Sequence, residues 1–430
     1  MSARRRSSHT AGDLTTAVGP DVERLTAGTA QVLPADGLAE RLAVAARERR
    51  PLRVKFGIDP SGSELTLGHA VVLRKLREFQ DLGHLAVLIV GDFTGMVGDP
   101  TGSSAVRSAL SRDQTAANSA TYLQQLMRIL DPDRVEVRRN SEWLAGLTLS
   151  DVVREARELT VARLLERDDF ARRYAEGRPI SLVEFLYPLL QGYDSVAVRA
   201  DVELGGTDQT YNLLVGRDLQ RAHGQPEQVV LTVPLLEGLD GTMKMSKSLN
   251  NFVAIAEPPE FQFGKLMSIP DPLVPRYAEL CTTLPAGELD RMRAAVATGG
   301  RAANAAKRRM ARAVVATYHG AAAAAAAEAH FDTRFKDRAV PQDAPTYPCP
   351  DQDPVHLPAL LVDAGLAPSR SQARRFLDEG AVRVDGEALQ PGTYDVERGR
   401  LVERVLQCGR RQAVRLVSDT ASGAGPRTGG

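Results

Sequence analysis

Residues 52–91 constrain the fold most, because a short apolar run, an amphipathic segment and a second apolar run follow one another there. The two runs, LRVKFGI and LAVLIVG, are continuously apolar, as parallel strands covered on both faces are. Between them, Val72, Leu73, Leu76 and Phe79 recur at helical spacing. The pattern predicts a β-α-β unit whose right-handed crossover brings both strand carboxyl ends to one edge, where a ligand would bind.

Length and composition limit the class of protein. A chain of 430 residues exceeds what one hydrophobic core usually supports, so we expect two or three domains. The 54 basic and 54 acidic residues cancel, so a nucleic-acid partner would have to meet a local basic patch. No apolar run approaches the roughly 18 residues of a membrane span, and the Arg/Ser-rich start lacks the apolar stretch of a signal peptide.

The three cysteines, Cys281, Cys349 and Cys408, are scattered and show no C-x-x-C spacing. This argues against a disulfide framework and against a zinc site. We therefore expect a cytoplasmic protein that makes no membrane contact and holds no metal ion through its own side chains.

The order of patterns predicts an α/β protein with several parts. A Rossmann-like parallel sheet with a helical insertion is followed by an α-helical domain and a small α+β domain. The expected boundaries are a disordered N-terminal extension at 1–30, the sheet domain at 31–255 with its insertion at about 112–200, the helical domain at 256–339, a proline-rich linker at 340–355, the small domain at 356–418 and a disordered tail at 419–430.

Lysine is rare in this chain, which makes the motif KMSKS informative. Only 7 of the 54 basic residues are lysines, and two of them, Lys244 and Lys247, lie in this motif after an apolar strand. A lysine ammonium binds phosphate as a movable point charge, whereas the arginine fork is rigid. The alternative is a solvated pair of loop charges, but the neighbouring glycines favour a mobile phosphate clamp.

Two further segments carry polar groups where a ligand could use them. TLGH, at 66–69, opens a predicted helix, and by itself His69 could be a capping or core histidine. In FLYPLLQGYD, the residues Tyr187, Gln191 and Asp194 stand at i, i+4 and i+7 on one helix face. Spacing alone also fits a helix face of mixed polarity. Polar groups on an inward face need partners, and a bound amino acid could supply them.

In chain order, TLGH, GGTDQ and KMSKS resemble the signature set of class I aminoacyl-tRNA synthetases. FLYPLLQGYD, together with VGDP at 97–100 and ELGGTDQ at 203–209, is similar to the tyrosyl-tRNA synthetase family over essentially residues 35–418. Lys55 follows the pattern of a second bacterial branch of that family.

The resemblance assigns roles only where residues match the motifs. It implies a tyrosine site made by Lys55, Asp99, Tyr187, Gln191, Asp194 and Gln209, with Asp194 accepting the phenolic hydroxyl. It implies an ATP site made by Gly57, Asp59, Ser61, Gly68, His69, Arg107, Gly206, Asp208 and Lys247. The catalytic groups would be Thr66, His69, Lys244 and Lys247.

The implied reaction has two steps. L-tyrosine and ATP would give tyrosyl-adenylate and pyrophosphate, and the tyrosyl group would then pass to the 3′ end of tRNA(Tyr). The substrate carboxylate is already a nucleophile, so the site must supply in-line positioning and positive charge. Mg²⁺ would arrive with ATP. The resemblance also implies a homodimer formed through the helical insertion.

Residues 356–389 predict a helix, a turn, an arginine-rich helix, a short strand and an Asp-Gly turn. This segment resembles the α-L RNA-binding domain. Its candidate tRNA-binding residues are Arg370, Arg374, Arg375 and Arg383. Such a module would read the shape and backbone of a folded RNA. A solvated basic helix face is the alternative.

Other functions fit part of the pattern. A tryptophanyl-tRNA synthetase shares the fold, but it normally lacks the C-terminal module, and Asp194 suits a phenol better than an indole. A specialised or resistant paralogue, or an RNA-binding regulator, is the alternative from another class. The retained Lys244 and Lys247 weigh against a regulator without catalysis.

Thr66 stands where the resembling family has its first histidine. A hydroxyl donates one hydrogen bond to a phosphate oxygen but carries no charge, so we expect slower adenylation than a histidine would give. Thr66→His is therefore predicted to raise the rate of tyrosine-dependent ATP/pyrophosphate exchange. An unchanged or lower exchange rate would contradict this prediction.

Overall fold

The computed structural model describes residues 18–60, 62–101, 112–337, 344–408 and 412–418. The chain divides into two compact units, 1–325 and 326–430, and each is described by itself. Among the described residues, no helix combines the length and the apolar character that crossing a membrane requires.

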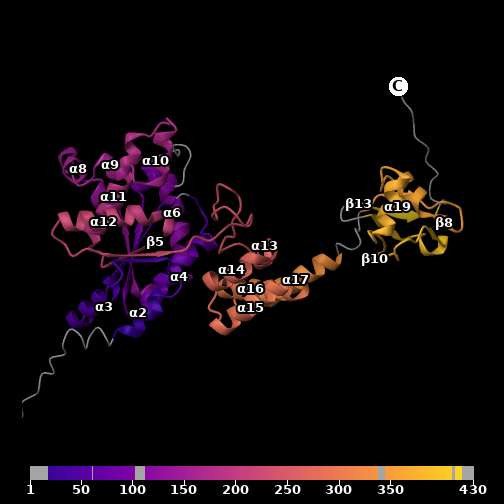
Figure 1. The fold of residues 1–430 in the computed structure, drawn as a ribbon, viewed down its shortest axis with the longest axis horizontal. Coiled ribbons are helices and arrows are strands. Elements are labelled where there is room, and N and C mark those ends of the chain that lie inside the picture. Colours follow the sequence, from indigo (N-terminus) through magenta and orange to yellow (C-terminus); the bar gives the residue numbers. More distant parts are fainter. Residues whose placement is uncertain (1–17, 61, 102–111, 338–343, 409–411, 419–430) are drawn as a thin grey trace, which may run out of the picture. The chain divides into compact units, whose positions relative to one another are not determined.

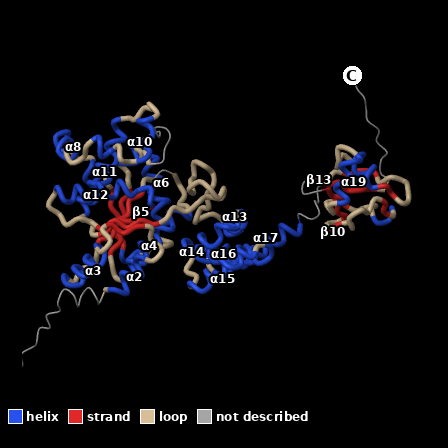
Figure 2. Tube along the Cα trace, viewed as in Figure 1, coloured by secondary structure: helices blue, strands red, loops and turns tan. Residues whose placement is uncertain are grey.

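A six-stranded sheet lies at the centre of the first unit, with helices packed on both sides of it (Figures 1 and 2). Its strand order is β1-β6-β5-β2-β3-β4, and only β1 runs antiparallel to its neighbour. The strands are β1 (Gln31–Leu33), β2 (Arg53–Ile58), β3 (Leu85–Val90), β4 (Val135–Arg139), β5 (Val202–Gly206) and β6 (Val229–Val233). The predicted α/β class and parallel sheet are confirmed.

The helices of this unit connect the strands and form the insertion. They are α2 (Gly19–Thr26), α3 (Gly37–Glu48), α4 (Leu67–Asp81), α5 (Thr94–Val97), α6 (Arg112–Leu126), α7 (Ser141–Leu144), α8 (Leu149–Ala156), α9 (Val161–Leu164), α10 (Asp168–Ala175), α11 (Leu182–Val198) and α12 (Thr210–Ala222). Short 3-10 turns lie at Pro132–Arg134 and Thr207–Gln209. Helix α11 begins with a reciprocal cap between Ser181 and Glu184, which satisfies amide groups that its first turn leaves open.

A run of helices follows the sheet. It contains α13 (Pro259–Ser268), α14 (Val274–Cys281), α15 (Ala286–Thr298), α16 (Gly300–His319) and α17 (Ala321–Asp337), with a 3-10 turn at Asp271–Leu273. The seven-alanine run forms the start of α17, where Ala324 and Ala327 are buried, so the tract packs through small side chains. The Tyr277 hydroxyl donates to the Glu237 carbonyl and ties α14 to the loop that carries Lys244.

The second unit has its own core. Its elements are β7 (Thr346–Pro348), β8 (Val355–His356), α18 (Leu357–Asp363), α19 (Arg370–Asp378), β9 (Val382–Val384), β10 (Glu387–Ala388), β11 (Asp395–Val396), a 3-10 turn at Arg398–Arg400, β12 (Val405–Cys408) and β13 (Gln412–Val417). The predicted Asp-Gly turn is present, because Asp385 and Gly386 both have positive φ, of 48° and 85°. Apolar residues of α18, α19 and the sheet share one cluster.

Three segments differ from the sequence-based expectation. Helix α2 lies within residues 1–30, a segment expected to be disordered, and its Leu25 is fully buried. Strand β4 lies inside the expected helical insertion, yet it completes the sheet beside β3. Strand β7 lies inside the expected linker and pairs with β13. Residues 1–17 and 419–430, also expected to be disordered, lie outside the described residues.

Candidate active site

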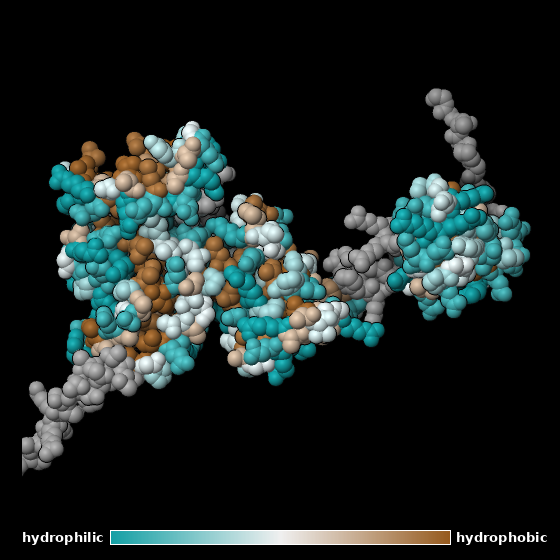
Figure 3. Space-filling view, viewed as in Figure 1, coloured by the Kyte–Doolittle hydropathy of each residue, from teal (hydrophilic) through white to brown (hydrophobic). Residues whose placement is uncertain are grey.

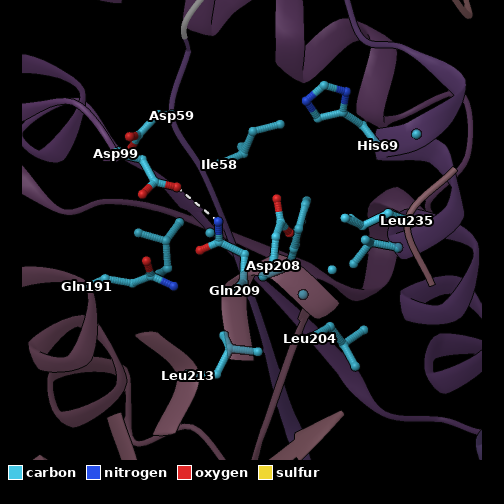
Figure 4. A pocket seen from close by; sticks show the side chains of 18 of the residues that line it. Ile58, Asp59, His69, Asp99, Gln191, Leu204, Asp208, Gln209, Leu213 and Leu235 are labelled. Atoms are coloured by element: carbon cyan, nitrogen blue, oxygen red, sulfur yellow. Dashed lines mark hydrogen bonds between the residues drawn. The ribbon is translucent and has the colours of Figure 1, made fainter. Parts of the chain in front are cut away.

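A cavity of about 640 Å³ opens at the carboxyl edge of the parallel strands. Its walls come from the ends of β2, β3 and β5, the start of α4, one face of α11 and the loop after β6, and Figure 4 shows ten of its side chains by name. Most of the predicted residues line it: Gly57, Asp59, Thr66, Gly68, His69, Asp99, Tyr187, Gln191, Asp194, Gly206, Asp208, Gln209, Lys244 and Lys247. Ser61 and Arg107 lie outside the described residues.

Asp194 forms a carboxylate floor for this cavity. Its side chain is only 3% exposed, and it accepts hydrogen bonds from the Trp143 indole Nε1 at 2.8 Å and from Asn140 Nδ2 at 3.3 Å. Burial raises the pKa of Asp194 to about 7, against the lowering effects of Lys55 and of the two donors. An additional hydrogen-bond donor arriving in the cavity would favour the charged carboxylate.

Lys55, expected beside the phenol, lies behind the cavity wall and does not line it. Its side chain is fully buried, with Nζ 2.8 Å from Glu203 Oε1, 2.9 Å from the Gln191 carbonyl and 2.7 Å from Ser195 Oγ. Three acceptors satisfy the three protons of the ammonium group. Lys55 therefore joins β2, β5 and α11, and it reaches the cavity through Glu203 and Gln191.

Asp59 and Tyr187 contact each other across the cavity. The Tyr187 hydroxyl donates to Asp59 Oδ2 at 2.8 Å, and the Thr94 hydroxyl donates to Asp59 Oδ1 at 2.7 Å. Burial, and then the Asp59 charge, raise the pKa of Tyr187 well above its usual value, so this phenol stays a donor. A Cβ at Gly91 would lie 2.0 Å from Asp59 Oδ1, so only glycine leaves room for the carboxylate.

Asp99, Gln209 and Gln191 are linked by a fourth side chain. Gln209 Nε2 donates to Asp99 Oδ2 at 2.9 Å, and Asn212 Nδ2 lies 3.0 Å from Gln209 Oε1 and 3.1 Å from Gln191 Oε1. The backbone amide of Thr101 donates to the other oxygen of Asp99 at 2.8 Å. The carboxylate of Asp99 is thus held by hydrogen bonds from the protein itself, one to each oxygen.

Thr66 and His69 meet at the start of α4. Thr66 precedes the helix in an extended conformation, and its backbone N–H, at 3.3 Å, and hydroxyl, at 2.8 Å, both face His69 Nδ1. Because a backbone N–H can only donate, Nδ1 is an acceptor and Nε2 carries the proton of the neutral ring. Burial, and then the Lys247 charge, lower the pKa of His69 to about 4, so the ring is neutral near pH 7.

The two motif lysines occupy the loop opposite TLGH. Lys244 pairs with Asp208 Oδ2 at 2.7 Å, while Lys247 Nζ lies 3.1 Å from the Glu64 carbonyl and bonds the Tyr122 hydroxyl. The end of the loop is anchored to the start of α4, since Thr66 and Ala254 form an antiparallel bridge. Both lysines line the cavity that contains His69.

Two of the three predicted glycines, Gly57 and Gly68, leave space that a ligand could use. A Cβ at Gly57 would meet nothing within 4 Å, and one at Gly68 would only reach ordinary contact with Thr66 and Met245. The protein itself does not demand glycine at either position. A closely bound ligand is the reason that the family resemblance suggests.

Several residues of the site carry no signal that spacing reveals. Asn140 and Trp143 follow β4, Tyr122 lies on α6 and Asn212 lies on α12. Trp143 is the single tryptophan of the chain, which was the one available hint. The others are ordinary polar residues whose roles arise from contacts over long sequence separations.

The four predicted RNA-binding arginines lie in the second unit. Arg370, Arg374 and Arg375 belong to α19 and Arg383 to β9, and all four are exposed. Arg375 pairs with Glu379 at 2.8 Å. Their exposure leaves the guanidinium groups accessible to a phosphate backbone.

Known proteins share this sequence over most of its length. The model for class I tRNA synthetases of the W and Y type matches residues 47–336. Tyrosine–tRNA ligase from Moorella thermoacetica is 48% identical over 392 residues, which is 91% of this chain and 94% of that protein. The chain belongs to the tyrosyl-tRNA synthetase family. Tyrosine–tRNA ligase from Acidithiobacillus ferrooxidans is 52% identical over 396 residues, or 92% of this chain and 97% of that protein.

This member of the tyrosyl-tRNA synthetase family also resembles solved structures in its fold, and its C-terminal module matches a second family model. A C-terminally truncated mitochondrial tyrosyl-tRNA synthetase from Aspergillus nidulans superposes with a TM-score of 0.62 at 20% identity, covering 76% of this chain and 98% of that one. At this identity the likeness shows the shared fold. The S4 domain model matches residues 356–399, within the second unit.

The pKa of Asp194 predicts a pH dependence. A phenol donates best to the ionised carboxylate, so the KM for tyrosine is expected to rise as the pH falls through about 7. Trp143→Phe removes a hydrogen bond that favours the ionised form, so the midpoint of this profile should move to higher pH. KM for tyrosine measured in ATP/pyrophosphate exchange from pH 6 to 9 tests both statements. A flat profile, or a midpoint that Trp143→Phe leaves unchanged or lowers, would contradict them.

Proposed function

We infer that the chain is a tyrosine–tRNA ligase, which activates L-tyrosine with ATP and transfers the tyrosyl group to the 3′ end of tRNA(Tyr). The observation that carries this inference is the position of Asp194, a buried carboxylate that lines the same cavity as Lys244 and Lys247. A phenolic hydroxyl completes its hydrogen bonding. A phenylalanine ring would leave the carboxylate desolvated and short of a partner, which costs about 1–3 kcal/mol or more for a charged group.

The substrate amino acid would lie between Asp194 and the opposite cluster of polar groups. We propose that Asp99, Tyr187 and Gln191 surround the α-ammonium group and that Gln209 lies near the carboxylate. The position of Asp99 supports this role, because Gln209 and the Thr101 amide already hold its carboxylate toward the cavity. A preformed acceptor loses little conformational freedom when the ammonium binds.

ATP would occupy the side of the cavity lined by Gly57, Asp59, Gly68, Gly206 and Asp208. Asp208 would contact the ribose. The low pKa of His69 supports a role as a neutral donor, with Nε2–H directed at a phosphate oxygen while Thr66 holds Nδ1. We also assign Ser61 and Arg107 to this side, on the family resemblance alone.

Adenylate formation needs no general base in this proposal. The tyrosine carboxylate attacks the α-phosphorus, the bond to the bridging oxygen breaks, and pyrophosphate leaves with that electron pair. Lys244 and Lys247 would neutralise the departing charge, and their present partners, Asp208 and Tyr122, hold them at the cavity until then. Electrostatic stabilisation and positioning thus supply the catalysis.

Magnesium would enter with ATP. Among the described residues, no group of three or more histidine, cysteine, aspartate or glutamate side chains is placed to hold a metal ion. Mg²⁺ typically keeps several waters and binds through substrate phosphates with one or two carboxylates, so Asp208 or Asp59 would suffice as a contact. The ion would add positive charge to the polyphosphate.

The two units would divide the work. The first unit, with the sheet and its helices, would carry out both chemical steps, and the S4-type unit would grip the tRNA through the arginines of α19 and Arg383. The three cysteines are all unpaired, which supports a reducing cytoplasm as the location.

ATP/pyrophosphate exchange with purified protein tests the function. We expect exchange with tyrosine and none with phenylalanine or tryptophan, dependence on Mg²⁺, and charging of tRNA(Tyr). Lys247→Met is expected to lower the exchange rate by about 100-fold with little change in the KM for tyrosine, because the lost charge acts on the leaving group. Exchange that depends on tryptophan, or no exchange with any amino acid, would refute the inference.

We also propose that the chain forms a homodimer through the helical insertion. Among the described residues of the insertion, seven large apolar side chains are exposed: Val137, Leu149, Val153, Val161, Tyr174, Leu182 and Val183. Leu149 and Leu182 are 79% and 81% exposed, and Figure 3 shows apolar surface over the region of α8 and α10. Exposed apolar groups that gather on one part of a surface mark an interaction site.

Light scattering during size-exclusion chromatography tests the dimer. The wild-type protein is expected to have the mass of two chains, and Leu182→Glu to have the mass of one, because a charge would be buried in the interface. Phe261→Glu, at an exposed apolar residue of α13, is the matched control and should leave the mass at two chains. A monomeric wild type, or a Leu182→Glu protein that remains dimeric, would contradict the proposal.

A further inference from the structure

A directed chain of hydrogen bonds leads from the insertion to the amino-acid site. The Arg167 guanidinium Nη1 donates to Asn212 Oδ1 at 3.4 Å, and Asn212 Nδ2 donates to Gln209 Oε1 at 3.0 Å. Gln209 Nε2 donates to Asp99 at 2.9 Å, the bond drawn in Figure 4. Asn212 also donates to Gln191 Oε1 at 3.1 Å.

The two ends of this chain set the orientation of every amide between them. A guanidinium group only donates, so the oxygen of Asn212 faces Arg167 and its NH2 group faces the two glutamines. An ionised carboxylate only accepts, so the NH2 group of Gln209 faces Asp99. Both requirements agree. None of the amides in this series of hydrogen bonds can rotate by 180° without placing two donors or two acceptors against each other.

The first members of the chain are held firmly. Arg167 is 7% exposed, forms two bonds to Asp169 at 2.6 and 2.7 Å, and stacks over the ring of Phe170 at 4.3 Å from its centroid. Asn212 is 1% exposed. A buried amide with fixed neighbours cannot exchange its partners for water, so its orientation passes on to the next group.

We propose that Asn212 is a positioning residue for tyrosine recognition, which orients the Gln191 and Gln209 amides and through Gln209 holds Asp99 ready for the substrate ammonium. This inference rests on the tyrosine-activating function inferred above. Asn212 does not line the cavity, and therefore acts through the groups that do. It also connects the insertion to the site, since Arg167 directly precedes α10.

Asn212→Asp tests the donor–acceptor direction of this hydrogen-bond series, because it changes the side-chain volume very little. The new carboxylate still pairs with Arg167, but it accepts where asparagine donated. Gln209 must then either leave the new carboxylate unpaired or turn its oxygen toward Asp99. We expect the KM for tyrosine in ATP/pyrophosphate exchange to rise about tenfold, with the KM for ATP changed less than about twofold.

Asn212→Ala distinguishes polarity from packing. It removes the whole amide and leaves a cavity, yet it opposes neither glutamine. We therefore expect a smaller rise in the KM for tyrosine than with Asn212→Asp, although the alanine variant loses more thermal stability. A residue that served only packing would give the reverse order in KM. Each variant also tests the proposal by itself, because the change in its KM for tyrosine is compared with the change in its KM for ATP.

Gln220→Glu is the matched control, because Gln220 is a buried amide of the same helix whose hydrogen bonds go to backbone groups of residues that do not line the cavity. It should leave both KM values at those of the wild type. An Asn212→Asp protein with an unchanged or lower KM for tyrosine would overturn the proposal, as added negative charge alone would favour the ammonium. Tyrosine-dependent exchange by the wild-type protein in the same assay distinguishes a failure of the Asn212 proposal from a failure of the inferred function.

Discussion

The buried ion pair between Lys55 and Glu203 fixes the geometry on which the site depends. It lies at the middle of the sheet, where β2 and β5 pair, and the same ammonium group binds Ser195 and the Gln191 carbonyl of α11. Removing one partner of a buried pair typically costs about 3–5 kcal/mol, because the other charge remains without compensation. Helix α11, which we propose to recognise the amino acid, is therefore held against the strands that would bind ATP.

Because Lys55 holds α11 against the sheet, one polar face of this helix points toward the cavity. A different element contacts each of the polar residues on that face. Tyr187 bonds Asp59 at the end of β2, Gln191 bonds Asn212 of α12, and Asp194 bonds Trp143 of α7. These hydrogen bonds are made between the protein's own groups, so substrate binding would have few side chains to order. Such preorganisation increases both affinity and discrimination, because the side chains are already ordered in the folded protein and lose little entropy on binding.

The sequence predicted the elements that local patterns encode and missed what depends on distant contacts. Continuous apolar runs identified β2 and β3, and motif order placed Asp194, His69 and Lys247 around one cavity. The family resemblance assigned Lys55 to the tyrosine site, but no spacing rule reveals that Glu203, 148 residues away in sequence, pairs with it in the core. Strand β4 was not predicted because it is a short edge strand that contains charged residues and lies among predicted helices. Strand β7 was not predicted because its partner, β13, follows almost seventy residues later in the sequence.

We propose that Asp194 marks the end of the cavity that binds the phenol and that Asp99 marks the end that binds the ammonium. A crystal structure of the protein with bound L-tyrosine measures this directly. The account predicts a phenolic oxygen within about 2.5–3.0 Å of an Asp194 oxygen, with Trp143 still donating to that carboxylate and the ammonium beside Asp99. A tyrosine bound in the opposite direction, or one whose hydroxyl contacts water instead of Asp194, would contradict it.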